Sequence, residues 1–233
     1  MNSNQLFSPE SSAAEVKNQG RSRVKVAVYS VLAVHVAGLM ALPAHAQSGP
    51  GYVTLKERAP VDAPAGQVEV VEFFSYGCSH CKNFEPTFQA WKKAAPKDVA
   101  VRMVHVGFQS SFEPLQRIYY TLETMGPAAL DKVHAKVFEA LQTERKRLDK
   151  PEVLFPWIAE QGIDRAKFEE TYKSFGVASK VRRAVQIQEA YHVEGTPALG
   201  IAGKYYTDGS MAGGFERMIQ ITNQLIEQER KRT

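Results

Sequence analysis

Apolar and polar positions follow two different periodicities along the chain, and these separate expected strands from expected helices. Residues 68–74 (VEVVEFF) form a short apolar run rich in β-branched and aromatic side chains, as buried strands do. Phe84, Phe88 and Trp91 follow at the i, i+4 and i+7 spacing of one helix face. A second apolar run covers 99–106, so strand, helix and strand in this order predict a βαβ unit with parallel strands.

The stretch from 110 to 191 carries helical periodicity and no strand pattern. Asp149-x-x-Glu152 has the form of a capping box and is expected to open one helix there, and Asp164 is expected to cap the next. The helices expected in this block cover 114–125, about 130–141, 149–162, 164–172 and 177–190.

Apolar strands return after the helical block. Residues 198–202 and 205–207 are joined by Gly203-Lys204 and predict a hairpin, and an apolar helix face follows within 215–226. A short first strand is expected at 52–56. The chain is therefore expected to run from a βαβ unit through a helical block to a ββα unit.

The N-terminal region has the three parts of a secretory signal peptide. Basic residues at 21, 23 and 25 precede an apolar run at 26–42, and Ala44-His45-Ala46 closes it. Cleavage is expected after Ala46; the alternative is an uncleaved membrane anchor, for which the run is short. The expected domains are a signal peptide at 1–46, a first half-domain at 47–109, a helical insertion at 110–191 and a second half-domain at 192–233.

Composition and charge limit the function classes. Of the 233 residues, 44% are hydrophobic and 23% are charged, which is ordinary for a globular protein. The formal net charge of +4 is too small to indicate nucleic-acid binding, and that class is set aside.

The only two cysteines, Cys78 and Cys81, stand where the 68–74 strand turns into a helix beginning at Ser79. A thiolate there faces the free N–H groups and the positive dipole end of that helix, which lowers its pKa and makes it a nucleophile. Two cysteines cannot fill a structural zinc site, and a disulfide across two residues would stabilise little. A redox dithiol–disulfide centre is therefore predicted, with no metal.

Two neighbours of the cysteines are candidates for tuning them. His80 lies within one turn of Cys78 and can favour its thiolate, unless it is an exposed histidine without a role. Glu72 stands inside the apolar strand, so its carboxyl should be desolvated with a raised pKa, which suits a proton acceptor for Cys81. The alternative for Glu72 is a structural ion pair, for example with Arg102 or Lys82.

Two further positions have plainer explanations. Pro197 precedes the strand at 198–202, where an ordinary trans proline would also be tolerated. His105 lies on the 99–106 strand and is expected to be a satisfied, partly buried histidine rather than a catalyst.

The arrangement resembles the thioredoxin fold, and the helical block behind a signal peptide resembles the DsbA family of periplasmic thiol:disulfide oxidoreductases. The resemblance implies an α/β, thioredoxin-like βαβ…ββα sheet with an inserted all-helical subdomain. The motifs that carry it are Glu72-Phe73-Phe74-Ser75, Cys78-x-His80-Cys81, Phe84-Glu85-Pro86 and Gly195-Thr196-Pro197-Ala198.

The resemblance also implies roles for individual residues. Cys78 would be the exposed nucleophile and Cys81 the buried resolving thiol, with His80 stabilising the thiolate and Glu72 as the buried acid behind Cys81. Pro197 would follow a cis peptide bond, and Thr196 would offer its backbone to an extended substrate.

Two positions depart from the commonest pattern of the family. Ser79 stands where many members have proline; it restores an N–H at the helix start, can hydrogen-bond a thiolate and is expected to face the substrate. Gly77 stands where an aromatic residue is frequent, which should open the surface beside Cys78.

The expected function is donation of the Cys78–Cys81 disulfide to folding exported proteins in the periplasm. The resemblance implies no cofactor beyond that disulfide, reoxidation by a membrane quinone-linked protein of the DsbB type, and a monomer. One alternative is an isomerase or reductase of the same fold, although the residues between Ala46 and Val68 are too few for the dimerisation domain usual in secreted isomerases. The other is a peptide-binding chaperone module with incidental cysteines.

Overall fold

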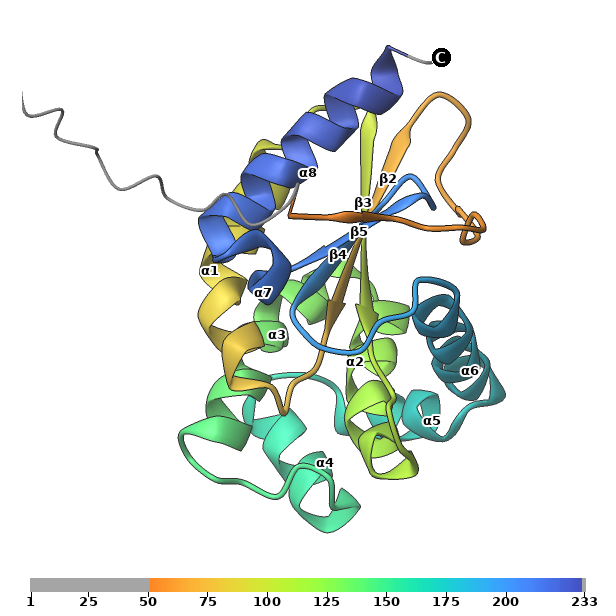
Figure 1. The fold of residues 1–233 in the computed structure, drawn as a ribbon. Helices are drawn as coiled ribbons and strands as arrows, with labels where there is room; N and C mark the ends of the chain where they lie inside the picture. The colour runs from red at the N-terminus through yellow and green to blue at the C-terminus, as the bar shows by residue number, and fades with distance from the viewer. Residues whose placement is uncertain (1–50, 232–233) are drawn as a thin grey trace, which may run out of the picture. The chain divides into compact units, whose positions relative to one another are not determined.

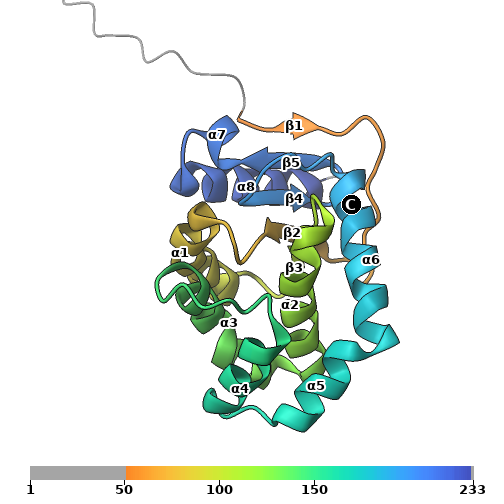
Figure 2. The same cartoon turned by 90° about the horizontal axis from the view of Figure 1, so that it is seen from below.

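The computed structural model describes residues 51–231, and the predicted signal peptide lies outside them. Within this range the strands form one five-stranded sheet in the order β1-β5-β4-β2-β3 (Figures 1 and 2). The strands are β1 (Val53–Thr54), β2 (Val68–Phe74), β3 (Val99–His105), β4 (Ala198–Ile201) and β5 (Tyr205–Asp208).

Strand β2 is the centre of the sheet. It pairs in parallel with β3, from Val68 opposite Val99 to Phe74 opposite His105, and antiparallel with β4. All residues of β2 after Val68 are buried, which is why its sequence is a nearly continuous apolar run. The predicted βαβ unit is confirmed, with α1 (Ser79–Ala94) as the connection.

Helices cover both faces of the sheet. Helix α8 (Phe215–Arg230) packs beside α1 and against β2, β4 and β5. Helices α2 (Glu113–Met125) and α6 (Phe175–Ala190) contact β3. Figure 2 shows α1 and α8 on one side of the sheet and α6 on the other.

The helical block between the two halves of the sheet is confirmed. It begins with a 3-10 turn, η1 (Ser110–Phe112), and α2 then packs against α3, α5 and α6. The remaining helices are α3 (Pro127–Gln142), α4 (Pro151–Glu160) and α5 (Arg165–Lys173). None of the helices in residues 51–231 is long and apolar enough to cross a membrane.

Of the two helix caps predicted in this block, one is confirmed and the other prediction is wrong. Asp164 caps α5 by accepting the Lys167 N–H at 2.9 Å, as predicted. Asp149 does not cap α4, whose N-cap is Lys150 without a side-chain hydrogen bond. Both Asp149 oxygens instead accept from Arg147, at 2.8 and 2.7 Å, because a bidentate guanidinium competes better for a carboxylate than neutral backbone N–H groups do.

The predicted hairpin of β4 and β5 turns through two consecutive residues in the left-handed region, Ala202 (φ 54°) and Gly203 (φ 67°). Such a pair matches the twist of the flanking strands. A Cβ on Gly203 would lie 2.4 Å from the Ala59 carbonyl oxygen, so glycine is required there. A short helix that the pattern did not predict, α7 (Gly209–Ala212), follows β5 and is capped by Asp208.

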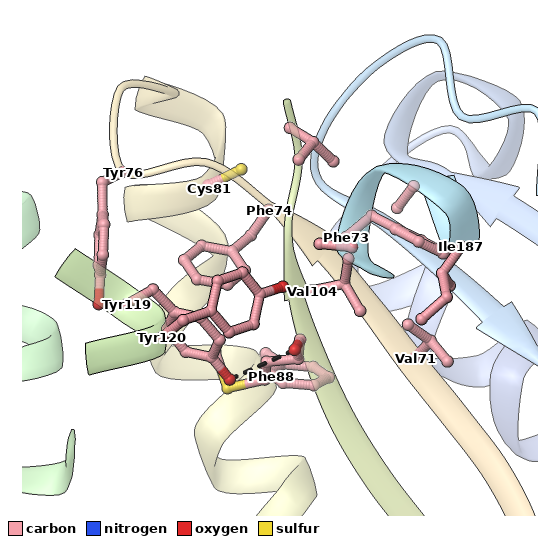
Figure 3. Close-up of a cluster of buried hydrophobic side chains, with 14 of the residues drawn as sticks. Val71, Phe73, Phe74, Tyr76, Cys81, Phe88, Val104, Tyr119, Tyr120 and Ile187 are labelled. Atoms are coloured by element: carbon pink, nitrogen blue, oxygen red, sulfur yellow. Dashed lines mark hydrogen bonds between the residues drawn. The ribbon is translucent and has the colours of Figure 1, made fainter. Parts of the chain in front are cut away.

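The core continues from the sheet into the helical block. The ring of Phe74, at the end of β2, meets Tyr76 and Tyr119 edge to face, with centroids 5.4 and 5.1 Å apart. Figure 3 shows these rings together near Cys81, where the chain leaves the strand. Aromatic packing of this kind adds to apolar burial and fixes the segment that carries the cysteines.

Candidate active site

Cys78 is the N-cap of α1. Its backbone is extended (φ −91°, ψ 118°), and its Sγ accepts the Cys81 N–H at 3.4 Å. The side chain of Cys78 is half-buried, whereas that of Cys81 is 1% exposed. The helix start therefore presents one sulfur to solvent and encloses the other.

The two sulfurs differ strongly in acidity. The pKa of Cys78 is lowered to about 5, chiefly by the hydrogen bond from the Cys81 thiol, with Thr196 and the backbone N–H groups of Cys81 and His80 adding to the effect against partial burial. Burial raises the pKa of Cys81, and the adjacent Cys78 raises it further. At neutral pH the reduced pair therefore holds a thiolate at Cys78 and a thiol at Cys81.

Residues far along the chain complete the site. The peptide bond between Thr196 and Pro197 is cis, as predicted, so the ordinary trans proline is excluded. The Thr196 carbonyl oxygen lies 3.3 Å from Cys78 Sγ, where it accepts a hydrogen bond from the protonated thiol. The turn before β4 thus places a backbone carbonyl beside the reactive sulfur.

The loop between β2 and α1 is held by contacts that the sequence did not reveal. Gln142, the last residue of α3, donates to the carbonyls of Tyr76 at 2.8 Å and Cys78 at 3.0 Å. The Tyr76 N–H donates to His105 Nε2 at 3.0 Å. Burial lowers the pKa of His105 to about 3, so it stays a neutral acceptor. The histidine is satisfied as predicted, but it is fully rather than partly buried, at 0% exposure.

His80 is exposed, and only its backbone N–H is among the groups that lower the Cys78 pKa. A role for its imidazole stays a prediction. The side chain lines a hollow of about 370 Å³ together with Pro197 and Asp208. Ser79, expected to face the substrate, is the exposed first residue of α1.

Glu72 is buried at 1% exposure, and its pKa is raised well above its usual range by desolvation and then by the charge of Glu85. Its Oε2 has no hydrogen-bond partner within residues 51–231. The expected alternative, an ion pair, is wrong: Arg102 pairs with Glu69 at 3.0 Å, and Lys82 pairs with Glu139 at 2.6 Å. The role of proton acceptor for Cys81 stays a prediction.

Sequence patterns also gave no sign of a buried series of polar side chains beside α1. The Tyr76 hydroxyl and His134 Nδ1 are 2.8 Å apart, and His134 Nε2 lies 3.2 Å from Glu85 Oε1. His134 comes from α3 and Glu85 from α1, and periodicity assigns both simply to helices. In the described part of the chain, no group of three or more His, Cys, Asp or Glu side chains could hold a metal ion.

Replacing Glu72 with glutamine should stabilise the oxidised protein increasingly as the pH rises. The folded-state pKa of Glu72 lies above its ordinary value of 4.5, so folding loses stability as the pH rises from 4.5 toward that raised pKa. Glutamine does not titrate, so the gain should be larger at pH 8 than at pH 4, by about 1 kcal/mol or more, because a charged group buried without a partner costs more than a neutral one. Urea unfolding at pH 4 and pH 8 measures it.

Glu69→Gln is the matched control, because Glu69 is equally buried on β2 but bonded to Arg102 and to the Asp62 N–H at 3.0 Å. It should destabilise the protein at pH 8. A gain from Glu72→Gln that is the same at both pH values would contradict the desolvation of its carboxylate.

Comparison with known proteins identifies the family and its fold. Residues 69–225 match the family of DSBA-like thioredoxin domains. The chain belongs to the DsbA family. Among solved structures, it resembles the crystal structure of Pseudomonas aeruginosa DsbA with a TM-score of 0.74 and 39% identity, over 78% of this chain and 93% of that one.

Curated DsbA-family relatives align with most of the chain. The thiol:disulfide interchange protein DsbA of Bordetella pertussis is 42% identical over 194 residues, which are 83% of this chain and 91% of the relative. That of Azotobacter vinelandii is 40% identical over 81% of this chain and 86% of the relative. The predictions of a thioredoxin-like fold with a helical insertion and of a DsbA-family thiol:disulfide oxidoreductase are confirmed.

Proposed function

We propose that this DsbA-family protein oxidises pairs of thiols in exported proteins by donating a Cys78–Cys81 disulfide. The observation that carries the proposal is the asymmetry of the two sulfurs. Cys78 is accessible with a pKa of about 5, while Cys81 is enclosed and its pKa is raised. A good leaving group at the accessible sulfur favours release of an oxidised substrate.

The reaction begins with the Cys78–Cys81 disulfide. A substrate thiolate attacks Cys78 Sγ, the S–S bond breaks, and Cys81 leaves with the electron pair and takes up a proton. A second substrate thiolate then attacks the substrate sulfur of the mixed disulfide. Cys78 leaves as a thiolate, the substrate holds the new disulfide, and two electrons have passed to the protein.

The other site residues would support these steps. The Thr196 carbonyl, 3.3 Å from Cys78 Sγ, would accept an N–H from an extended substrate when Cys78 is in a disulfide. Pro197 and the exposed Ser79 would border the same substrate, and His80 would stabilise the departing thiolate. Glu72 would exchange a proton with Cys81.

Membership of the DsbA family supports proposals for the cofactor, the reoxidising partner and the compartment. The redox-active disulfide would serve without an external cofactor, and a membrane quinone-linked protein of the DsbB type would reoxidise it. The protein would act as a periplasmic monomer after cleavage following Ala46. Residues 47–109 and 192–233 would form the thioredoxin-like domain around the insertion at 110–191.

Equilibration of the cysteine pair with glutathione buffers tests the direction of the reaction. Reduction potentials for thioredoxin and for a DsbA are about −270 and about −120 mV, and this protein should lie nearer the second value. Acid quenching, thiol alkylation and mass spectrometry give the reduced fraction. A potential near that of thioredoxin would instead support the reductase or isomerase alternative.

A further inference from the structure

One face of α3 runs along Tyr76, which stands two residues before the reactive cysteine. His134, Phe138 and Gln142 follow one another at intervals of four residues, so their side chains share this face. His134 Nδ1 lies 2.8 Å from the Tyr76 hydroxyl. The Phe138 ring meets the Tyr76 ring edge to face, with centroids 5.0 Å apart, and the Gln142 amide donates to the Tyr76 carbonyl at 2.8 Å. The helical insertion therefore holds Tyr76 by its hydroxyl, its ring and its backbone.

Gln142 also reaches the cysteine itself. Its Nε2 donates to the Cys78 carbonyl at 3.0 Å, and the same carbonyl accepts the Lys82 N–H at 3.1 Å. The bond from Lys82 is the first backbone hydrogen bond of α1. A carbonyl that is bound from two sides fixes the rotation of its peptide plane, and this rotation is the ψ angle of Cys78. Gln142 thus acts on the dihedral angle that makes Cys78 the N-cap of the helix.

The ψ angle of Cys78 determines where its sulfur lies relative to α1. At ψ 118° the sulfur lies over the first turn of the helix, where it accepts the Cys81 N–H at 3.4 Å. Free N–H groups at a helix start stabilise an anion, and the backbone N–H groups of Cys81 and His80 both lower the pKa of Cys78. This stabilisation depends on keeping the N-cap geometry.

The end of α3 is fastened to α1 by a second set of contacts. Lys82 Nζ lies 2.6 Å from Glu139 Oε2 and also donates to the Thr143 hydroxyl. Glu139 and Thr143 lie within one helical turn of Gln142. Partly exposed ion pairs of this kind add little to stability, but they keep Gln142 beside the start of α1.

We infer that Gln142 is a positioning residue for the redox reaction, which holds Cys78 in the N-cap conformation where the helix start stabilises its thiolate. The inference rests on the proposed thiol oxidation. In the oxidised protein the S–S bond to Cys81 already fixes the Cys78 side chain, whereas no covalent bond does so in the reduced protein. The hydrogen bonds from Gln142 therefore favour the reduced state more than the oxidised state, and this makes the protein a stronger oxidant.

Gln142→Leu and Gln142→Glu test this role, because the side chain is partly exposed and either replacement fits there. Leucine removes the amide, and an ionised glutamate of the same shape can only accept hydrogen bonds. Each variant should raise the pKa of Cys78 by about one unit, as expected for the net loss of one hydrogen bond. The equilibrium with glutathione should shift about tenfold toward the oxidised protein. Thiolate absorbance follows the pKa, and acid quenching with alkylation follows the equilibrium.

Two control variants remove other contacts and leave these two carbonyl bonds in place. Gln67→Leu deletes an amide that donates to the Lys97 carbonyl at 3.0 Å, at the end of β2 remote from Cys78. Tyr76→Phe deletes the hydroxyl beside His134 but keeps the ring and the backbone. Whatever they cost in stability toward urea, both should leave the pKa of Cys78 within about 0.3 units of the native value.

The possible results separate the inference from the proposed function. A native pKa of Cys78 in both Gln142 variants would overturn the inference and leave the oxidase function standing. An equal rise of this pKa in either control would also overturn it, because the shift would then report a general loosening of the fold. A native protein that oxidises no dithiol peptide would overturn the function itself.

Discussion

Replacing Cys78 with serine should reduce the oxidation of dithiol peptides to the uncatalysed rate. A hydroxyl cannot form the disulfide that is donated, and serine is close enough in size for the half-buried N-cap position to keep its structure. The assay is peptide oxidation with glutathione disulfide as the terminal oxidant. Near-UV circular dichroism checks that the fold is retained.

Cys81→Ser is the partner variant, and it should behave differently. It keeps the accessible Cys78 but lacks the thiol that resolves a mixed disulfide, so it should accumulate covalent adducts with substrate cysteines. Mass spectrometry of unreduced samples detects them. Full activity of Cys78→Ser would exclude the proposed mechanism and favour a peptide-binding chaperone with incidental cysteines.

The reduced protein should lose stability as the pH falls from neutral toward 5, and Cys78 should be the cause. Its folded-state pKa is about 5, against an ordinary value of 9.0. A group whose pKa is lowered by folding stabilises the folded state when it is deprotonated. This stabilisation is complete above the pKa of the unfolded state, and it is lost as the pH falls through the pKa of the folded state. At pH 7 the thiolate should contribute about 2 kcal/mol, after allowance for solvent screening.

Urea unfolding of the reduced protein and of reduced Cys78→Ser between pH 4 and 8 isolates this contribution, because other titrating groups cancel in the difference. The difference should be near zero at pH 4 and grow with pH. Parallel curves would contradict a lowered pKa. Cys81→Ala should raise the Cys78 pKa, since the Cys81 thiol gives the largest stabilisation of the thiolate, and thiolate absorbance near 240 nm follows it.

The same electrostatics would set the strength of the oxidant. Interactions that stabilise the Cys78 thiolate exist only in the reduced protein, so they favour transfer of the disulfide to a substrate. The stability of the reduced protein and its strength as an oxidant therefore share one origin, the stabilised Cys78 thiolate. A variant that raises the Cys78 pKa should become both a weaker oxidant and less stable when reduced.

Helix caps show where local prediction failed. Asp149 and Asp164 are both acidic residues placed before a helix, yet only Asp164 caps one. The guanidinium of Arg147 binds both oxygens of Asp149. The sequence contains both possible partners, and only the folded loop shows which of them reaches the carboxylate.

Local features were determined by the sequence alone. The bounds of β2, the start of α1 at Ser79 and the position of Cys78 at the helix start follow from side-chain periodicity and adjacency, which need no distant contacts. The order of strands and helices then restricts the topology to a βαβ and a ββα half around a helical block.

Only the tertiary structure decided what surrounds the two sulfurs. Gln142 reaches the Cys78 carbonyl across 64 positions, and the Thr196 carbonyl reaches Cys78 Sγ across 118. Within residues 51–231, Glu72 Oε2 proved to have no hydrogen-bond partner, and Gly77 proved to line a hollow of about 350 Å³ beside Cys78. Such contacts join single side chains from separate elements and leave no periodic signal, so they are set by how the helical insertion packs against the sheet rather than by any local pattern.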